Sequence, residues 1–509
     1  MGSGIGLEAS CVHFWGDSFL IKFQVVTASM VQLIRCLTVV FTVLFTVMPG
    51  SSLAQARQST ENNRSWIAGD HHIHSRWSVG WDWETDPPAP IKGGDAIYPI
   101  PMNALMAQHY GLSWIVATDH GGPNHSKVNV EQAYPEFLES REVVPGVIQF
   151  WGMELDTPAA EHSSLIIPHT HDEADVLEEI ERRWARRDAW PPDSTRDQLV
   201  RMIEALDHMK DLAEPPLVIV NHPGRTATGM GEYTRVTPDE LRQWNNTAPE
   251  VAVGMAGAPG HQAAGIHADG SPRMEPRGSY GRFPTMGGFD QLTARVGGFW
   301  DSMLGEGRRW WITANSDSHI HWTEGGEDFW PGEYSKTYVL AEKNHADILD
   351  GIRSGRVFVT TGDLVSELWV EVSAGDLSAG IGGELTIDEN SDLTVTIRFL
   401  DPDIQNAKGD NPSVNRVDLI TGQIHGIQDN MGLDVNPSTR VVARFGAEDW
   451  KKEGDYRVIR TTIENVDHDM YIRVRGTNTS DLEPMTDPRG EDPWSDLWFY
   501  SNPVFVGLQ

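Results

Sequence analysis

Nine side chains of the types that bind transition metals are spread over residues 72–319, most of them in short motifs such as Asp70-His-His-Ile-His74 and Ser316-Asp-Ser-His319. They are His72, His74, Asp95, His120, Glu154, His162, His222, Asp317 and His319. Neutral imidazole and carboxylate groups are ligands that zinc, manganese and iron share. Because several of these motifs each follow an apolar, strand-like run, the set predicts a multinuclear metal site.

The elements that must position these side chains alternate between strand-like and helical patterns from Trp66 to about Gly362. The expected strands are 65–70, 112–118, 147–151, 217–220, 310–314 and 356–360, and the expected helices are 102–110, 193–212 and 345–352. Metal-binding residues that recur after strands alternating with helices are typical of a parallel α/β barrel. In such a barrel the active site lies at the carboxyl ends of the strands.

The pattern changes after Gly362. Runs such as 368–372, 393–399 and 470–475 alternate apolar and polar residues, and Gly, Asp and Asn cluster between them. A period of two indicates antiparallel strands, and several short runs of this kind predict an all-β sandwich. We therefore expect an α/β domain over residues 57–363 and a β-sandwich domain over residues 364–509.

The first 56 residues have the pattern of a targeting segment, with Met30 as the expected true start. Arg35 precedes an apolar run from Cys36 to Met48, and Ala54-Gln-Ala56 follows. A basic region, a short apolar region and an A-x-A site are typical of a secretory signal peptide, and the run is too short for a membrane span. Cleavage after Ala56 would remove both cysteines of the chain, which excludes disulfides and thiolate ligands. This segment predicts a periplasmic or secreted protein with no membrane span after cleavage.

The charge balance of the chain excludes one class of partner. Asp and Glu number 73 against 40 Lys and Arg, which gives a formal net charge of −33. A field of this sign repels nucleic acid and anionic membrane surfaces. We therefore expect a small-molecule substrate and no nucleic-acid partner, and the sequence does not indicate an oligomeric state.

The ordered set of motifs resembles the PHP (polymerase and histidinol phosphatase) superfamily over about residues 65–362. The resemblance implies a distorted seven-stranded α/β barrel that binds two or three divalent metal ions, here Mn, Zn or Fe. One position departs from the family pattern, because Val79 stands where the family has the Asp of a Ser-Asp-Gly motif. An insertion at about 79–94 restores the family spacing and makes Asp95 the displaced ligand.

The resemblance also implies how the metal ligands are divided. His72, His74 and Asp317 would hold one ion, Glu154 would bridge to a second ion held by His162 and His222, and Asp95, His120 and His319 would hold the third. Two cations that share a carboxylate lower the pKa of a bound water, so a hydroxide between them would be the nucleophile. Glu154, Asp317 and Arg225 are the expected catalytic residues, and Asp70 and Asp119 would orient ligand imidazoles.

Three functions remain open at this level. Hydrolysis of a phosphoester is favoured, because Arg225 and Arg76 follow metal motifs and a guanidinium binds phosphate oxygens bidentately. Hydrolysis of a carboxylic or carbamate ester is the alternative, because the export signal, the Trp81 and Trp83 insert and the C-terminal domain are similar to the carbaryl-hydrolase-like group of this superfamily. The third is a non-catalytic, metal-containing extracellular binding module.

Overall fold

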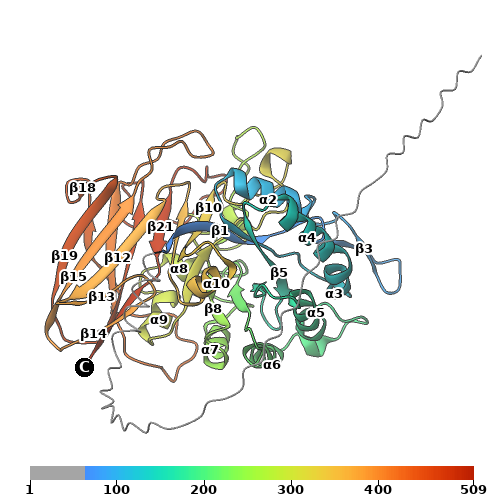
Figure 1. Ribbon diagram of the computed structural model, residues 1–509, viewed down its shortest axis with the longest axis horizontal. Coiled ribbons are helices and arrows are strands. Elements are labelled where there is room, and N and C mark those ends of the chain that lie inside the picture. The colour runs from blue at the N-terminus through green and yellow to red at the C-terminus, as the bar shows by residue number, and fades with distance from the viewer. Residues whose placement is uncertain (1–62) are drawn as a thin grey trace, which may run out of the picture. The chain divides into compact units, whose positions relative to one another are not determined.

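The computed structural model describes residues 63–509, so the predicted signal peptide lies outside the described residues. The described residues all belong to one compact unit. Its fold is mixed α/β, with one 15-stranded sheet, one five-stranded sheet and a two-stranded hairpin (Figure 1). Within residues 63–509, no helix combines the length and the apolar character needed to cross a membrane.

The first half of the large sheet carries the predicted metal motifs. Its strands, in spatial order, are β1 (Ser65–Ile73), β4 (Trp114–Ala117), β5 (Ile148–Asp156), β6 (His162–Ile166), β7 (Leu217–Val220), β8 (Ala252–Ala258) and β9 (Trp311–Ala314). Neighbours pair in parallel except at β6, which runs antiparallel to both β5 and β7. This corrects the expected all-parallel order. The reason is the short connection 157–161, because a parallel crossover needs a dozen or more residues.

Helices cover one side of these strands (Figure 1). The longer ones are α2 (Ile100–His109), α4 (Tyr134–Val143), α5 (Glu173–Trp184), α6 (Leu199–Lys210), α7 (Pro238–Thr247) and α10 (His345–Arg353). The short ones are α3 (His125–Val128), the π-turn η1 (Asn129–Ala133), η2 (Ser194–Arg196), η3 (Arg277–Ser279), α8 (Gln291–Ala294), α9 (Phe299–Gly305) and η4 (Trp322–Glu324). The expected helix 193–212 is present as η2 and α6, and α6 buries Met202, Leu206 and Met209 on one face, as its periodicity predicts.

The large sheet continues into the C-terminal half of the chain. From β1 it runs through β10 (Ser335–Ala341), β11 (Val357–Thr361), β21 (Trp498–Ser501), β20 (Met470–Thr477), β22 (Val504–Leu508) and β14 (Glu384–Ile387), with β16 (Arg416–Gln423) and β17 (Arg440–Phe445) on a branch. The five-stranded sheet contains β13 (Leu377–Ala379), β12 (Glu367–Ala374), β15 (Ser391–Leu400), β19 (Tyr456–Val466) and β18 (Lys451–Glu453). The strands expected after residue 362 are therefore present. The pairing of β11 with β21 spans the proposed boundary at residue 363, and that division stays a prediction.

The path of strands from β1 to β9 returns to its starting point. The amide of Asp317, just after β9, donates to the carbonyl of His72 at 3.0 Å, and the amide of His74 donates to the carbonyl of Ser318 at 3.0 Å. The hydroxyl of Thr337 on β10 donates to the carbonyl of Ala314 at 2.7 Å. The segment after β9 therefore lies beside the end of β1, which brings the first and last metal motifs together.

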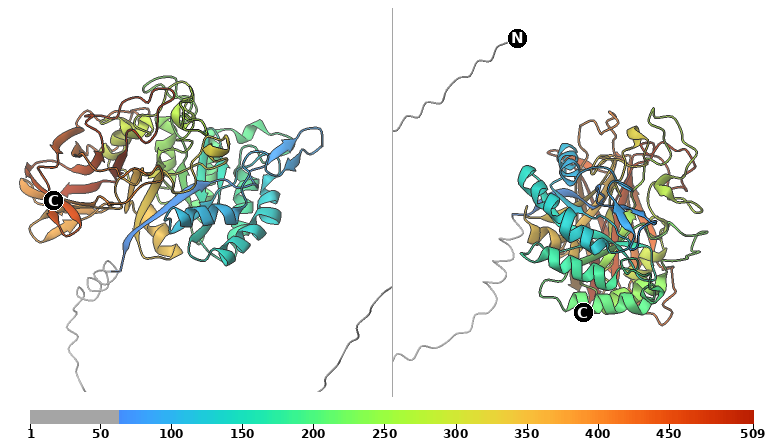
Figure 2. Two further views of the ribbon diagram at one scale, coloured as in Figure 1. Left: turned by 90° about the horizontal axis from the view of Figure 1, so that it is seen from above. Right: turned by 90° about the vertical axis from the view of Figure 1, so that its right-hand side faces the viewer.

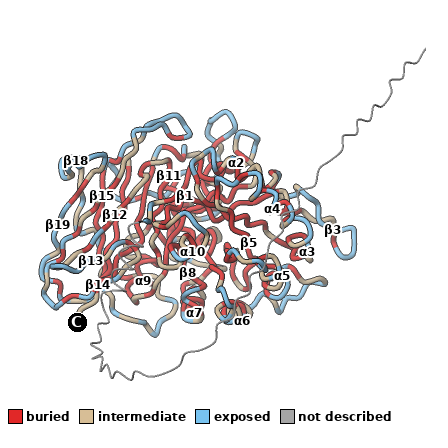
Figure 3. Tube along the Cα trace, in the orientation of Figure 1, coloured by how far each residue is buried: buried red, intermediate tan, exposed pale blue. Residues whose placement is uncertain are grey.

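Buried tryptophans fill the interior around these strands. Trp114 and Trp151 are fully buried in the main core, so they pack the fold and do not line a substrate wall. The approach is close, because a Cβ on Gly69 would lie 2.0 Å from the ring of Trp114. Figure 3 shows the burial running along the strands, while connecting loops are exposed. The hairpin of β2 (Gly80–Asp82) and β3 (Ala89–Ile91) projects from the body and carries the exposed Trp83 (Figure 2, left).

Candidate metal centre

All the metal motifs meet at one edge of the large sheet. His72, His120, His222 and Asp317 lie in or just after the carboxyl ends of β1, β4, β7 and β9. His162 is the first residue of β6, and because β6 runs antiparallel, its beginning lies at the edge where its neighbours end. The reversed strand thus places its imidazole with the others.

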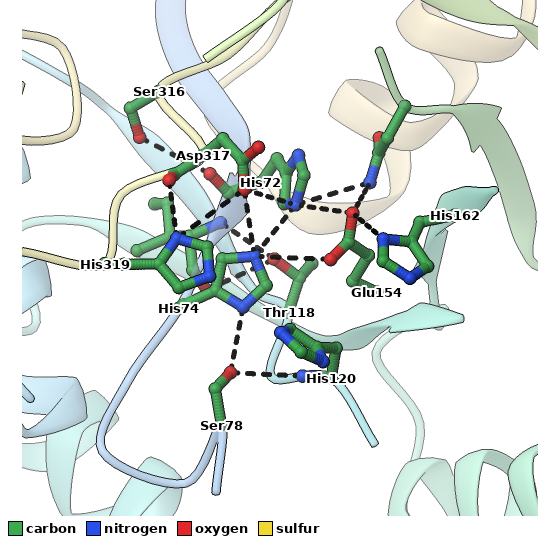
Figure 4. A network of polar contacts seen from close by, with 12 residues as sticks. His72, His74, Ser78, Thr118, His120, Glu154, His162, Ser316, Asp317 and His319 are labelled. Atoms are coloured by element: carbon green, nitrogen blue, oxygen red, sulfur yellow. Dashed lines mark hydrogen bonds and ion pairs between the residues drawn. The ribbon is translucent and has the colours of Figure 1, made fainter. Parts of the chain in front are cut away.

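The innermost group contains His72, His74, Glu154 and Asp317, all buried. His72 Nε2 lies 3.1 Å from an oxygen of Glu154 and 3.1 Å from Oδ1 of Asp317. His74 Nε2 lies 3.1 Å from the same Asp317 oxygen and 2.9 Å from His72 Nε2. Figure 4 shows these four side chains converging from β1, β5 and the segment after β9. Two imidazole nitrogens and two carboxylates thus surround one point.

A second group shares Glu154 with the first. Oε1 of this carboxylate lies 3.2 Å from His222 Nε2 and 3.3 Å from His162 Nδ1. Asn221 donates to the same oxygen at 3.0 Å and is itself held by Ser164. Because Glu154 faces both groups, it has the position required of a bridging ligand.

A third group lies toward solvent and includes the residue that the sequence analysis inferred from an insertion. Asp95 follows the β2–β3 hairpin, and its Oδ2 lies 2.8 Å from His120 Nε2 and 3.2 Å from His319 Nε2. His74 is near enough to belong to this group as well. The structure therefore brings all nine predicted residues together, and the hairpin occupies the stretch proposed as an insert.

The deepest groups have protonation states that suit cation binding. Burial, reinforced by the nearby imidazole of His319, lowers the pKa of His74 well below its ordinary value. Burial and the charge of Arg225 lower the pKa of His222 to about 3, so both rings are neutral. Burial alone would raise the pKa of Glu154, but His162 and His72 outweigh it and hold that pKa well below its ordinary value. Neutral imidazoles and ionised carboxylates are the forms that bind metal. In His162 and His319 burial opposes the charged ring, but nearby carboxylates outweigh it and raise the pKa values to about 10 and about 9, so a cation would have to displace a proton from these two rings.

Hydrogen bonds outside the clusters fix several of these rings. Nδ1 of His74 contacts the hydroxyl of Ser78 at 2.8 Å, and Ser78 donates in turn to Asp119 at 3.1 Å. Asp70 accepts from the amides of His72 and Ser316, both at 3.0 Å. Neither carboxylate contacts an imidazole directly, in contrast to the expectation. Asp119 acts through a serine, and Asp70 holds the backbone of two ligand motifs.

Sequence reasoning missed His261, which follows β8 and joins the outer side of the site. Its Nε2 lies 3.1 Å from Oδ2 of Asp317, and its Nδ1 contacts Asp328. Asp328 also accepts from the amide of His319 at 2.7 Å. Burial opposes the charged ring, but Asp317 and Asp328 outweigh it and raise the pKa of His261 well above its ordinary value. The apolar run ending at Ala258 was the available signal, because each of the other strands on the path from β1 to β9 carries a predicted ligand in or close to its end at this edge.

The two arginines named from the sequence have different surroundings. Arg225 NH2 lies 2.9 Å from Oδ2 of Asp317, so its guanidinium is part of the site. Arg76 pairs instead with Glu136 at 2.6 Å, and that carboxylate also accepts from the indole of Trp77. Only Arg225 of this pair is available to the site.

The backbone around the centre is strained. His222, His261 and Asp317 all have positive φ, at 31°, 55° and 49°. A non-glycine residue in this region costs on the order of 1 kcal/mol or more and persists only where neighbours enforce it. All three lie shortly after strands that end at this edge. Holding their backbones in this conformation lowers the free energy of unfolding and fixes the direction of the site side chains.

The donor set fits divalent cations. Within each group the donor atoms lie within 4.8 Å of one another, and the deepest members are fully enclosed. Oxygen and imidazole nitrogen without thiolate suit Zn, Mn or Fe. His120, His162, His261 and His319 are each partly exposed, so the clusters are open to solvent on one side. These groups of His, Asp and Glu could therefore hold metal ions while remaining accessible to a small molecule.

Comparisons with known proteins add little to this geometry. No family model matches the chain, and no curated protein matches it. Among solved structures, the chain is similar to Endonuclease Q in complex with a 27-mer duplex substrate with an abasic lesion at the active site, at 12% identity and a TM-score of 0.29. The match covers 57% of this chain and 56% of that chain, so this chain spans little more than half of the neighbour's length. A likeness at this level carries no inference about function.

Proposed function

We propose that the protein is an exported, metal-dependent hydrolase that cleaves an ester bond in a small molecule, with a phosphoester favoured. The observation that carries the proposal is the convergence of nine donor residues in adjoining groups, two of which share Glu154, with Arg225 against Asp317. We read the first half of the chain as a PHP-type barrel and the C-terminal strands as a β-sandwich. Export follows from the expected signal peptide.

The proposed division of ligands follows the three groups. His72, His74 and Asp317 would hold one cation, Glu154 with His162 and His222 a second, and Asp95 with His120 and His319 a third. When bound, divalent cations at these positions would lower the pKa of a water and stabilise negative charge on the attacked ester. The protein would keep the two inner positions rigid through Asn221, Ser78 and Asp70.

The position of Arg225 supports hydrolysis of a phosphoester. One terminal nitrogen of its guanidinium contacts Asp317, and its Nε is buried without a partner among the described residues. A guanidinium with a free donor beside a metal cluster suits a phosphate oxygen. Arg225 would orient the phosphoryl group, and His261, held by Asp328, would supply a proton to the leaving oxygen from its Nε2.

Hydrolysis of a carboxylic or carbamate ester is favoured by a different observation. Trp81 packs on the turn directly after His120, since a Cβ on Gly122 would lie 2.3 Å from its Nε1. Trp83 on the same hairpin lies against Trp190, with ring centroids 6.2 Å apart. Aromatic rings beside the cluster would bind the apolar part of a neutral aryl ester.

A non-catalytic binding module is the weaker reading. A module that has lost catalysis is expected to lack some of the metal ligands, whereas every predicted donor is present in the clusters. It also gives no role to Arg225 beside Asp317.

A paired assay tests the proposal. The purified protein is loaded separately with Mn, Zn and Fe, and turnover of 4-nitrophenyl phosphate mono- and diesters is compared with turnover of an aryl acetate and an aryl N-methylcarbamate. We expect metal-dependent turnover of the phosphates, lost on Glu154→Gln. Turnover of the acyl or carbamoyl esters alone would select the second reading. No turnover of any of the four substrates by the metal-loaded protein would refute hydrolysis of these ester classes.

Export needs a separate measurement. Fractionation of producing cells, with N-terminal sequencing of the recovered protein, should find it outside the cytoplasm and beginning near residue 57. A cytoplasmic protein with an intact N-terminus would contradict export without affecting the metal centre.

A further inference from the structure

A cavity of about 620 Å³ lies away from the metal motifs, and none of the predicted metal ligands lines it. One wall comes from the start of β1, the end of β10 and the turn after α10. The floor is a face of the five-stranded sheet, formed by β12, β15 and β19. Its size is that of sites that hold small molecules or cofactors.

The floor is built from two rows of residues that face one another across strands. In one row Trp369 pairs with Arg398, and Arg398 with Val458. In the other, Thr396 lies between Glu371 and Arg460. Side chains on one face of a sheet alternate with those on the other, so these residues point the same way.

Arg398 is the unusual member of the floor. Its guanidinium lies between two aromatic rings, 5.1 Å from the centroid of Trp369 and 4.6 Å from that of Tyr456. Its Nε is buried and has no hydrogen-bond partner among residues 63–509, and no carboxylate of that range pairs with it. In a chain of net charge −33, a partly buried guanidinium that no carboxylate of the described residues pairs with is a position for an anion.

The other charges of the lining are already neutralised or exposed. Arg64 pairs with Asp347 at 2.7 Å, and Arg356 with Asp350 at 2.9 Å. Arg460 pairs with Glu453 at 2.7 Å, and Glu371 is exposed at the surface. Arg398 is therefore the cation of the lining that remains available to a ligand.

Two aromatic side chains form a corner of the cavity. Trp66 and Trp369 meet edge to face, with centroids 5.6 Å apart, and both line the cavity. Nε1 of Trp66 is buried and also lacks a hydrogen-bond partner among the described residues. Rings inclined at 68° to each other offer a stacking surface, and the indole N–H of Trp66 lies beside it. The loop opposite is open, because a Cβ on Gly380 would have its nearest neighbour 3.8 Å away.

We propose that this cavity is a second ligand site, which binds a small molecule that combines a carboxylate with a flat ring. The carboxylate pairs with the guanidinium of Arg398, and the ring packs in the corner of Trp66 and Trp369. The site is independent of the proposed hydrolase, because none of its residues belongs to the metal clusters. Trp66 begins the strand that carries His72, so a ligand here contacts an element shared with the metal centre.

Calorimetric titration of the purified full chain with 2-naphthoate tests the proposal, with 2-naphthamide and inorganic phosphate as comparison probes. We expect saturable binding of the naphthoate and weaker binding of both comparison probes by roughly tenfold or more. Equal binding of the amide would remove the role of Arg398. Equal binding of phosphate would remove the role of the rings. No saturable binding of naphthoate would overturn the site.

Variants locate the binding. Arg398→Met keeps the stem of the side chain and removes the charge, and Gly380→Leu fills the cavity. Each should weaken naphthoate binding by roughly tenfold or more. Arg457→Met is the matched control, because Arg457 lies on β19 next to the cavity residue Val458 but faces the other side of the sheet. Circular dichroism and thermal unfolding check that all three fold. Naphthoate binding that survives both cavity variants would place it elsewhere, such as the metal clusters, and overturn the proposal.

Discussion

Arg225 NH2 lies 2.9 Å from Oδ2 of Asp317, on the side of that carboxylate away from His72 and His74. The imidazoles of His72 and His74 thus face Oδ1 of this carboxylate, while the guanidinium shares Oδ2 with Nε2 of His261. Asp317 can face a metal through Oδ1 while Oδ2 positions the guanidinium. Under the proposed function, Arg225 would recognise the substrate while Oδ1 of Asp317 holds the cation, which gives the first prediction.

Arg225→Gln should lower kcat/KM for an aryl phosphate by about 100- to 1,000-fold, because it removes a charge-assisted contact to the phosphoryl group. Turnover of an acyl ester should change far less, and metal content should stay constant by elemental analysis. Arg273→Gln is the control, since Arg273 pairs with Glu327 in the long loop after β8. An equal loss on both substrate classes would assign Arg225 to positioning of Asp317 alone.

The outer cluster can be removed without disturbing the inner ones. Asp95 is 39% exposed and contacts only the rings of His120 and His319 within the site. Asp95→Ala should reduce the metal bound per chain by one ion and leave the melting temperature nearly unchanged. Glu84→Ala, on the same hairpin and exposed, serves as the control. Unchanged metal content in the Asp95 variant would contradict a third site.

Gly260 permits the close approach of two site segments. A Cβ there would lie 2.0 Å from Cβ of Asp317 and 2.3 Å from the carbonyl of Ser316. Gly260→Ala must therefore displace Asp317, and a displacement near 1 Å at a reacting centre costs about 100-fold in rate. Gly281→Ala is the control, because a Cβ on Gly281 meets nothing within 4 Å. Wild-type kinetics and metal affinity in the Gly260 variant would contradict the assigned geometry.

A buried pair beside the site makes stability depend on pH. Burial opposes charge on His125, but Glu181, 2.7 Å away, outweighs it and raises the pKa of His125 from 6.5 to about 9. The folded state therefore binds this proton more tightly than the unfolded state. The stabilisation is fully present below pH 6.5 and is lost as the pH rises through 9.

Urea unfolding at pH 6.5 and pH 9.5 measures this effect. The wild-type protein should lose roughly 3 kcal/mol more of its free energy of unfolding over this interval than His125→Gln does. His109→Gln, at an exposed position, should behave as the wild type. The same loss in His125→Gln would show that other groups cause it.

The sequence was informative where function is tied to strand ends. His72, His120, His222 and Asp317 each follow or end an apolar run, so their convergence could be predicted from local pattern alone. Asp95 required a second argument, the spacing across an insert, and the hairpin of β2 and β3 now accounts for it. Local pattern works here because a strand in a sheet has a defined edge, and whatever follows it must lie there.

What could not be predicted depends on contacts between distant segments. His261 lies in a loop whose path is set by the approach of Gly260 to Asp317. Arg76 is not available to the site because it pairs with Glu136, which lies on the distant helix α4, and the sequence around Arg76 does not indicate this partner. The antiparallel direction of β6 could have been predicted from the sequence, because the connection 157–161 is too short for a parallel crossover. The cavity around Arg398 joins residues from both halves of the chain, and no pattern in either half indicates it.

Because β11 pairs with β21, dividing the chain near residue 363 would separate two strands that are hydrogen-bonded to each other. A chain ending there would leave the backbone donors and acceptors of β11 without partners along an open edge, and such an edge recruits strands from other molecules. The C-terminal strand β21 therefore covers an edge of β11 that a truncated chain would expose. Any truncated or recombined version of this protein would have to protect that edge in another way to avoid association through it.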